Sequence, residues 1–313
     1  MPRRRVAAAS APAVFVLLWS TGFIGAKYAL PYAEPFTLLA LRLAIAAALL
    51  GALAALTRAP APRTPAQYGR SAISGVLLHT AYLGGVFWAI AHGVPAGVAA
   101  VVVSLQPVLV AALAGVLLGE HLVAIQWAGL VLGIAGVLLV LAPGLSAGGL
   151  TFAGVLACAI ALAGGTVGTL HQKRYGDGIP LLGGTAVQYA AASLVLLVAA
   201  VSTETNTIRW TAQFVAAMVW LVLVLSLGAV LLLLFLLRRG SASGVSTLFY
   251  LVPPATAIEA YLIFGEELGP LQLVGILVTT VGVALVVRPP RRAVTAPRAG
   301  SPPASGSTPP GVS

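Results

Sequence analysis

LQPVLVAALAGVLLGEHLVAIQWAGLVLGIAGVLLVLAP, residues 105–143, returns without a gap as LVPPATAIEAYLIFGEELGPLQLVGILVTTVGVALVVRP, residues 251–289. The offset of 146 positions is constant, and it aligns residue types that an apolar composition does not align by chance. The matched pairs are Pro107 with Pro253, Gly119 with Gly265, Glu120 with Glu266, Gln126 with Gln272, Gly129 with Gly275, Gly136 with Gly282 and Pro143 with Pro289. The chain therefore contains a duplicated unit. In a membrane protein such duplication favours transport, because two related halves can move around a shared central site.

The composition predicts a membrane protein. Of 313 residues, 59% are hydrophobic and 8% are charged, and the mean hydropathy is +1.03. A soluble protein of this length cannot bury so much apolar surface. A helix needs about 20 apolar residues to cross a bilayer. We therefore expect an all-α membrane protein with ten transmembrane helices, at residues 11–30, 36–56, 72–91, 96–118, 124–142, 151–170, 180–201, 213–237, 242–264 and 270–287.

The distribution of positive charge predicts the topology. The net charge of +10 raises the question of a nucleic-acid partner, but 14 of the 17 Lys and Arg residues fall in segments on one side of the predicted membrane. Only Arg209 falls in a loop on the opposite side, while Lys27 and Arg42 lie inside predicted helices. The positive-inside rule then places both termini in the cytoplasm. We expect a multi-pass protein of the cell membrane. No nucleic-acid partner is expected.

The repeat also defines the domains. We predict a cytoplasmic N-terminus at 1–10, a first five-helix repeat at 11–143, a linker at 144–150, a second five-helix repeat at 151–288 and a disordered cytoplasmic tail at 289–313. Five crossings per repeat make the second copy enter the membrane in the opposite orientation, so the repeats are inverted. One chain then holds both halves, and we expect a monomer or a homodimer in the lipid bilayer.

Several motifs resemble those of the drug/metabolite transporter superfamily, in its ten-helix EamA-type family. They are Leu18-Trp19-Ser20-Thr21-Gly22, Glu34-Pro35-Phe36 with Leu41-Arg42, Leu105-Gln106-Pro107 through Gly119-Glu120, and Tyr250-Leu251-Val252-Pro253 through Gly265-Glu266. The resemblance covers residues 11–288. It implies a secondary carrier, commonly an exporter, for small metabolites or drugs. It also implies a central site walled by helices 1, 3, 4, 6, 8 and 9.

Glu259 is the first candidate for the site. A charged side chain near the middle of a membrane costs about 2.5–3.5 kcal/mol, so its presence needs a reason. Its repeat counterpart is Leu113, so the fold does not require an acid there. We predict that Glu259 lines the cavity and exchanges a proton or holds a cationic substrate. The alternative is an acid that forms a structural ion pair with Lys27 or Arg42, or one that reaches the outer interface.

Further candidates follow from polar and aromatic residues inside helices. Ser20 shares a face of the first helix with Lys27, seven residues on. His79 is a candidate proton relay with Tyr82 on the same side, or else satisfies a backbone carbonyl. Trp88 and Tyr250 are expected in the pocket, although most such aromatics pack or anchor. For Arg42 we expect snorkelling to the outer headgroups or a salt bridge in preference to binding an anionic group.

Prolines and boundary acids suggest moving parts. Pro107 and Pro253 lie centrally in helices 4 and 9 and break the backbone hydrogen-bond ladder, and Pro254 doubles that effect. We interpret them as architecture with a hinge role. Glu120 and Glu266 end the same two helices, where the helix dipole disfavours an acid. Each is predicted to form an interhelical contact that closes a gate, or else to be a solvated boundary charge.

The sequence contains no recognised motif for catalysis or for binding a cofactor. There are no HExxH, GxSxG or GxxxxGK[ST] sequences, and Cys158 is the only cysteine, so no catalytic residue, metal or cofactor is predicted. The leading hypothesis is a secondary transporter that exports small organic metabolites or drugs across the cytoplasmic membrane by alternating access. The alternatives are an intramembrane enzyme, which needs more converging polar groups, and a channel or structural subunit, which would require filter-like loops or rings of charge.

Overall fold

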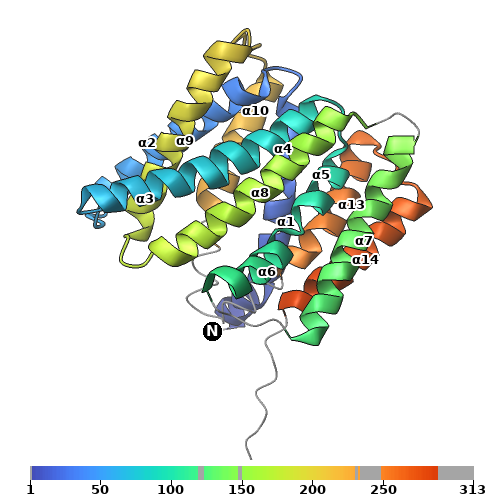
Figure 1. Ribbon diagram of the computed structural model, residues 1–313. Helices are drawn as coiled ribbons and strands as arrows, with labels where there is room; N and C mark the ends of the chain where they lie inside the picture. The colour runs from blue at the N-terminus through green and yellow to red at the C-terminus, as the bar shows by residue number, and fades with distance from the viewer. Residues whose placement is uncertain (1, 119–122, 147–149, 230–231, 233–247, 288–313) are drawn as a thin grey trace, which may run out of the picture.

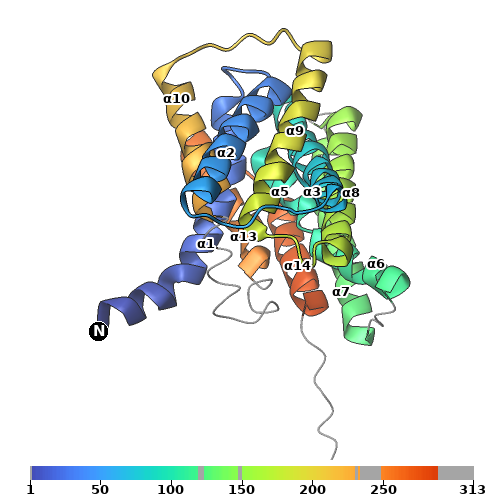
Figure 2. The same ribbon diagram turned by 90° about the vertical axis from the view of Figure 1, so that its left-hand side faces the viewer.

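The protein is a bundle of helices, described by a computed structural model over residues 2–118, 123–146, 150–229, 232 and 248–287 (Figures 1 and 2). The first repeat contains α1 (Pro2–Ala29), α2 (Pro35–Leu56), α3 (Pro65–Gly75), η1 (Val76–Ala81), α4 (Tyr82–Ala91), α5 (Ala96–Val103), α6 (Gln106–Leu118) and α7 (Ala124–Ser146). The second contains α8 (Phe152–Tyr175), α9 (Leu181–Thr203), α10 (Ala212–Val219), η2 (Trp220–Ala229), η3 (Phe249–Leu251), α13 (Val252–Phe264) and α14 (Pro270–Val287).

These elements join into ten helical rods within the described residues, five for each repeat. The segments α3–η1–α4, α5–α6, α10–η2 and η3–α13 each continue along one rod. Seven helices are long and apolar enough to cross a membrane, and two shorter apolar ones lie at 249–264 and 270–286. Large apolar side chains such as Leu138, Leu262 and Leu277 are exposed on the outside of the bundle. That surface suits lipid, so the prediction of an all-α multi-pass membrane protein is confirmed.

Local sequence sets where the helices begin. Thr64, Thr151 and Thr211 each accept a hydrogen bond at the start of a helix, from Gln67, Gly154 and Phe214 respectively. The side-chain oxygen satisfies one of the backbone N–H groups that the first turn leaves without a partner. Several predicted ends differ: α1 begins at Pro2 and not at 11, the rod of α3 begins at Pro65 and not at 72, and α7 continues through Pro143 to Ser146, inside the predicted linker.

The two repeats meet through a symmetric contact between α7 and α14, the most extensive between any two helices described (Figure 1). Gly129 faces Gly282, and Gly136 faces Gly275. Gly129 and Gly275 are repeat equivalents, as are Gly136 and Gly282. One contact is therefore the image of the other under a two-fold rotation, the arrangement of a symmetric dimer interface within one chain. The antiparallel pairing is what inverted repeats require.

Other helix pairs follow the same symmetry. α2 packs on α9, its counterpart in the second repeat. α1 packs on α13 and on η2, and its counterpart α8 packs on α6 and on η1. α1 and α8 therefore occupy equivalent places between the repeats.

Candidate functional site

A hydrogen bond between the repeats links two of the predicted site residues. The hydroxyl of Ser20 in α1 donates to Oε1 of Glu259 in α13 over 2.7 Å. Ser20 is fully buried, and the second carboxylate oxygen, Oε2 of Glu259, is buried without a hydrogen-bond partner among the described residues. Thr256, one turn earlier, is also fully buried, and its hydroxyl likewise has no hydrogen-bond partner among the described residues. Buried polar groups in proteins are normally satisfied, so these atoms could receive hydrogen bonds from a solute or from water.

Glu259 does not pair with either predicted cation. Lys27 instead forms an ion pair with Oε1 of Glu266, and the same oxygen accepts a hydrogen bond from the backbone N–H of Ala96 over 3.2 Å. Lys27 lies in the last turn of α1, Ala96 begins α5 and Glu266 follows α13, so three rods meet at this acid. A carboxylate beside a helix N-terminus is favoured by the helix dipole. Glu120, the matched acid of the first repeat, lies outside the described residues.

The loop between α9 and α10 reinforces this end of the bundle. Glu204 accepts hydrogen bonds from the backbone N–H groups of Phe36 and Thr37, each over 2.7 Å, and so caps α2 from another helix. Glu34 in turn accepts from Thr205. Residues 27–37, 96, 204–209 and 266 together form what we call the tied end.

Both predicted hinges coincide with irregular backbone. In the first repeat, α5 ends at Val103 and α6 begins at Gln106, so Pro107 lies in the first turn of a new helix. In the second, the 3-10 turn of η3 at Phe249–Leu251 directly precedes Pro253 and Pro254 in α13. Proline is tolerated in a first helical turn because no N–H partner is lost there. The hinge role stays a prediction.

A second irregularity was not predicted. The rods of α3–α4 and α10 both contain π-helical segments, η1 and η2. At the repeat offset of 146, residues 76–81 correspond to 222–227, which lie within η2. Such π segments are uncommon and occur often at functional sites. His79 lies in η1, where its ring contacts that of Tyr189 with centroids 4.7 Å apart.

Arg42 lies beside these segments, and the prediction for it was wrong. It is only 4% exposed, so it does not reach the headgroups, and no described residue forms an ion pair with it. Its Nε donates to the hydroxyl of Ser226 in η2 over 3.1 Å. Its guanidinium lies 5.9 Å from the ring centroid of Phe87.

The remaining aromatic candidates do not gather around Glu259 in the contacts of the described residues. Trp88 stacks on His92 at the end of α4, with centroids 3.6 Å apart. Tyr250 is buried in η3, and Tyr82 packs against Gly165 of α8 beside Gln106. Gln106 donates to the carbonyl of Gly165 and the hydroxyl of Thr169. Among the predicted binding residues that the structure describes, only Ser20 and Glu259 are therefore brought together.

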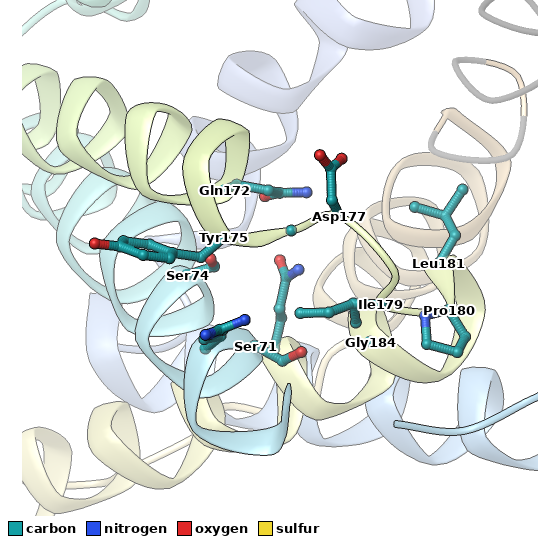
Figure 3. A pocket seen from close by; sticks show the side chains of 12 residues that line it. Ser71, Ser74, Gln172, Tyr175, Asp177, Ile179, Pro180, Leu181 and Gly184 are labelled. Carbon is teal, nitrogen blue, oxygen red and sulfur yellow. The ribbon is translucent and has the colours of Figure 1, made fainter. Parts of the chain in front are cut away.

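A cavity of about 220 Å³ opens at the end of the bundle opposite the tied end (Figure 3). It lies where α3 begins, α8 ends and α9 begins, and its lining is Arg70, Ser71, Ser74, Gln172, Tyr175, Gly176, Asp177, Ile179, Pro180, Leu181, Gly184 and Gln188. None of the residues selected from the sequence lines it. The hydroxyl of Ser71 is buried there without a partner among the described residues. The cavity lies between repeats, since α3 belongs to the first and α8 and α9 to the second.

Comparison with known proteins gives a consistent result. A family model described as the EamA-like transporter family matches residues 9–142 and 151–288. The chain is 29% identical to the uncharacterized transporter YvbV of Bacillus subtilis, over 88% of this chain and 89% of that protein. It is also 29% identical to a WAT1-related chloroplastic protein of Arabidopsis thaliana, over 86% of this chain and 66% of that protein. A solved crystal structure shares the fold with a TM-score of 0.64 and 21% identity, covering 90% of this chain and 96% of the other.

Proposed function

The chain belongs to the EamA-like transporter family and is a membrane transporter of small molecules, and we propose that it is a secondary carrier that exports small organic solutes across the cell membrane by alternating access. Both termini face the cytoplasm in this proposal. The tied end is then the outer end, and the cavity of Figure 3 opens towards the cytoplasm.

The observation that carries the proposal is the half-buried carboxylate of Glu259, held by Ser20 across the repeat boundary. Because α1 and α13 belong to different repeats, any movement of one repeat against the other changes this contact. A proton or a cationic group that binds Glu259 competes with the Ser20 hydroxyl for the carboxylate. Binding at this site is thereby coupled to the relative position of the repeats, which is the requirement for a carrier.

The symmetry of the fold supports alternating access. Each repeat can take the conformation of its counterpart, so a structure closed at one end implies a second one closed at the other. Lys27, Glu266 and Ala96 are joined at the tied end, and the cavity lies at the opposite end, which is the asymmetry that alternating access requires.

Counterflow in proteoliposomes tests the carrier function. Vesicles loaded with unlabelled solute from a panel of amino acids, organic acids and organic amines should accumulate the labelled form of one of them transiently. A carrier shows this trans-stimulation because the loaded site returns faster than the empty one. Uptake that saturates with no counterflow for any transported solute would identify a channel.

Breaking the tied end is expected to expose the site from outside. In a Cys158→Ala background, a cysteine at Thr256, which is fully buried beside Glu259, reports opening. Adding Glu266→Gln removes the ion pair with Lys27 and leaves that cation without its counterion. A partly exposed pair contributes up to about 1 kcal/mol, so labelling of right-side-out vesicles by an impermeant maleimide should accelerate about fivefold.

Glu267→Gln is the matched control. It removes the same charge from the adjacent residue, which is exposed and makes no described salt bridge. Labelling at position 256 should be unchanged. Equal acceleration by both variants would mean that surface charge, and not the contact of Lys27 with Glu266, controls the outer opening.

A further inference from the structure

Arg42 is a buried cation for which the described protein supplies no counterion. Of the seven acidic residues in the sequence, six lie in the described residues, and the single ion pair there joins Lys27 and Glu266. Arg42 lies two turns into α2, inside a predicted membrane span. A cation at such a place costs about 2.5–3.5 kcal/mol on insertion scales and usually faces a partner or a cavity.

The second repeat shows that the fold does not need this charge. At the offset of 146, Arg42 corresponds to Gln188, and Thr80 corresponds to Ser226. Arg42 donates to Ser226, and in the second repeat Gln188 lines the cavity between α3, α8 and α9. A neutral amide thus fills the equivalent place in α9. The positive charge of Arg42 is an addition to the architecture.

The surroundings of Arg42 leave part of the guanidinium available. Among the described residues, Nε is its one hydrogen-bonding atom, and the acceptor is Ser226. Ser226 is itself held by η2, because its hydroxyl donates to the carbonyl of Leu221 over 3.0 Å. The terminal NH2 groups are the part of arginine that recognises planar oxyanions through two parallel hydrogen bonds.

α9 links the wall of the cavity in Figure 3 to the surroundings of Arg42. Gln188 lines the cavity, and the next residue, Tyr189, packs against the ring of His79. The Tyr189 hydroxyl donates to the carbonyl of Ser226, the residue that holds Arg42. Two consecutive residues of α9, together with Ser226, therefore connect the cavity wall to the guanidinium. The rings of Phe87, Tyr189 and His79 around it suit a solute with an apolar or aromatic body.

We propose that Arg42 binds the carboxylate of the transported solute, so that the substrate class is small organic acids with an apolar or aromatic body. This rests on the proposed carrier function for its physiological meaning. Binding itself is independent of transport, because a carboxylate can bind Arg42 in detergent. Arg42 and Glu259 then have opposite roles: the one attracts the acid of the solute, and the other exchanges a proton or a cation.

Thermal unfolding of purified protein with matched probes tests the site. Benzoate and phenylacetate are compared with benzamide and phenylacetamide, which have the same shape without the charge, at equal ionic strength. A ligand that binds only the folded protein raises the unfolding temperature. The carboxylates should raise it by a few degrees and the amides by much less. Equal shifts for acid and amide, or no shift for either acid, would overturn the proposal.

Three variants assign the effect to Arg42. Arg42→Gln installs the residue of the second repeat and should remove the carboxylate shift, while Arg42→Lys keeps the charge and should retain part of it. Arg63→Gln makes the same replacement at an exposed loop position and should leave the shift intact. A carboxylate shift that survives in Arg42→Gln contradicts the proposal. If Arg42→Gln does not fold, the test uses Arg42→Lys alone. Shifts in its unfolding temperature that are as large as in the wild type, and equal for acid and amide, contradict the proposal as well. Counterflow without carboxylate binding would refute this inference alone, whereas carboxylate binding without counterflow would refute the carrier.

Discussion

Replacing Glu259 by glutamine is expected to reduce transport driven by a proton gradient at least tenfold while counterflow of the same solute continues. Glutamine has nearly the shape of glutamate, and its carbonyl oxygen can still accept the hydrogen bond from Ser20. It cannot gain or lose a proton. If Glu259 couples the proton to the solute, the loss therefore falls on the driven reaction, and tenfold corresponds to about 1.4 kcal/mol.

The measurement is uptake into proteoliposomes with and without an imposed pH gradient, at several external pH values. The wild type should depend on pH, and the variant should show a flat profile. Glu267→Gln, the exposed neighbour of the tied end, should behave as the wild type. Driven transport by Glu259→Gln equal to that of wild type at every pH would assign the carboxylate a structural role only.

Ser20→Ala separates the carboxylate from the residue that holds it. The acid remains, but its Oε1 loses the hydrogen bond from Ser20, and such a bond contributes about 1.5–3 kcal/mol when one partner is charged. Ser20→Ala should therefore shift the pH profile of transport without flattening it. A flat profile in this variant would show that the proton is exchanged through Ser20 and not by Glu259 alone.

Much of the fold could be predicted because it depends on local properties. Apolar length fixes a transmembrane helix, and a constant offset of glycines and prolines fixes a repeat. The contact of Ser20 with Glu259 was not predicted, although both residues were candidates, because helix periodicity does not say which helix a face meets. The pair of Lys27 and Glu266 is hidden for the same reason, since 239 positions separate the two.

Arg42 shows the limit most clearly. Its depth of two turns is compatible with snorkelling, and sequence position alone cannot distinguish a side chain that points to lipid from one that points to Ser226. The alignment of the two repeats does single out Arg42, however, because Arg42 aligns with Gln188, just as Glu259 aligns with Leu113. Both ionisable residues break the internal symmetry. Such differences between otherwise matched halves are a usable guide to the site when no related sequences are compared.

The contact between α7 and α14 is expected to be the most sensitive part of the fold, and Gly282→Ala to lower the unfolding temperature strongly. A Cβ at Gly282 would lie 2.4 Å from the backbone nitrogen of Gly133 and 2.7 Å from the carbonyl oxygen of Gly129. Neither atom can turn away as a side chain would, so the helices must separate along the seam. Overpacking costs about 1–3 kcal/mol, and we expect the upper end of that range. Thermal unfolding in detergent measures it.

The symmetry of the seam makes the prediction sharper. Gly136→Ala, the equivalent change in the first repeat, meets the backbone nitrogen of Thr279 at 2.5 Å and the carbonyl oxygen of Gly275 at 2.7 Å. The new Cβ also meets the Thr279 hydroxyl. The repeat equivalent of Thr279 is Gly133, which has no side chain, so Gly136→Ala should lower stability slightly more than Gly282→Ala. Gly51→Ala is the control, because no atom lies within 4 Å of its Cβ and alanine favours a helix by up to about 1 kcal/mol. If both seam variants unfold at the temperature of Gly51→Ala, the repeats are not held together at these glycines, and closure of the bundle must depend on the tied end.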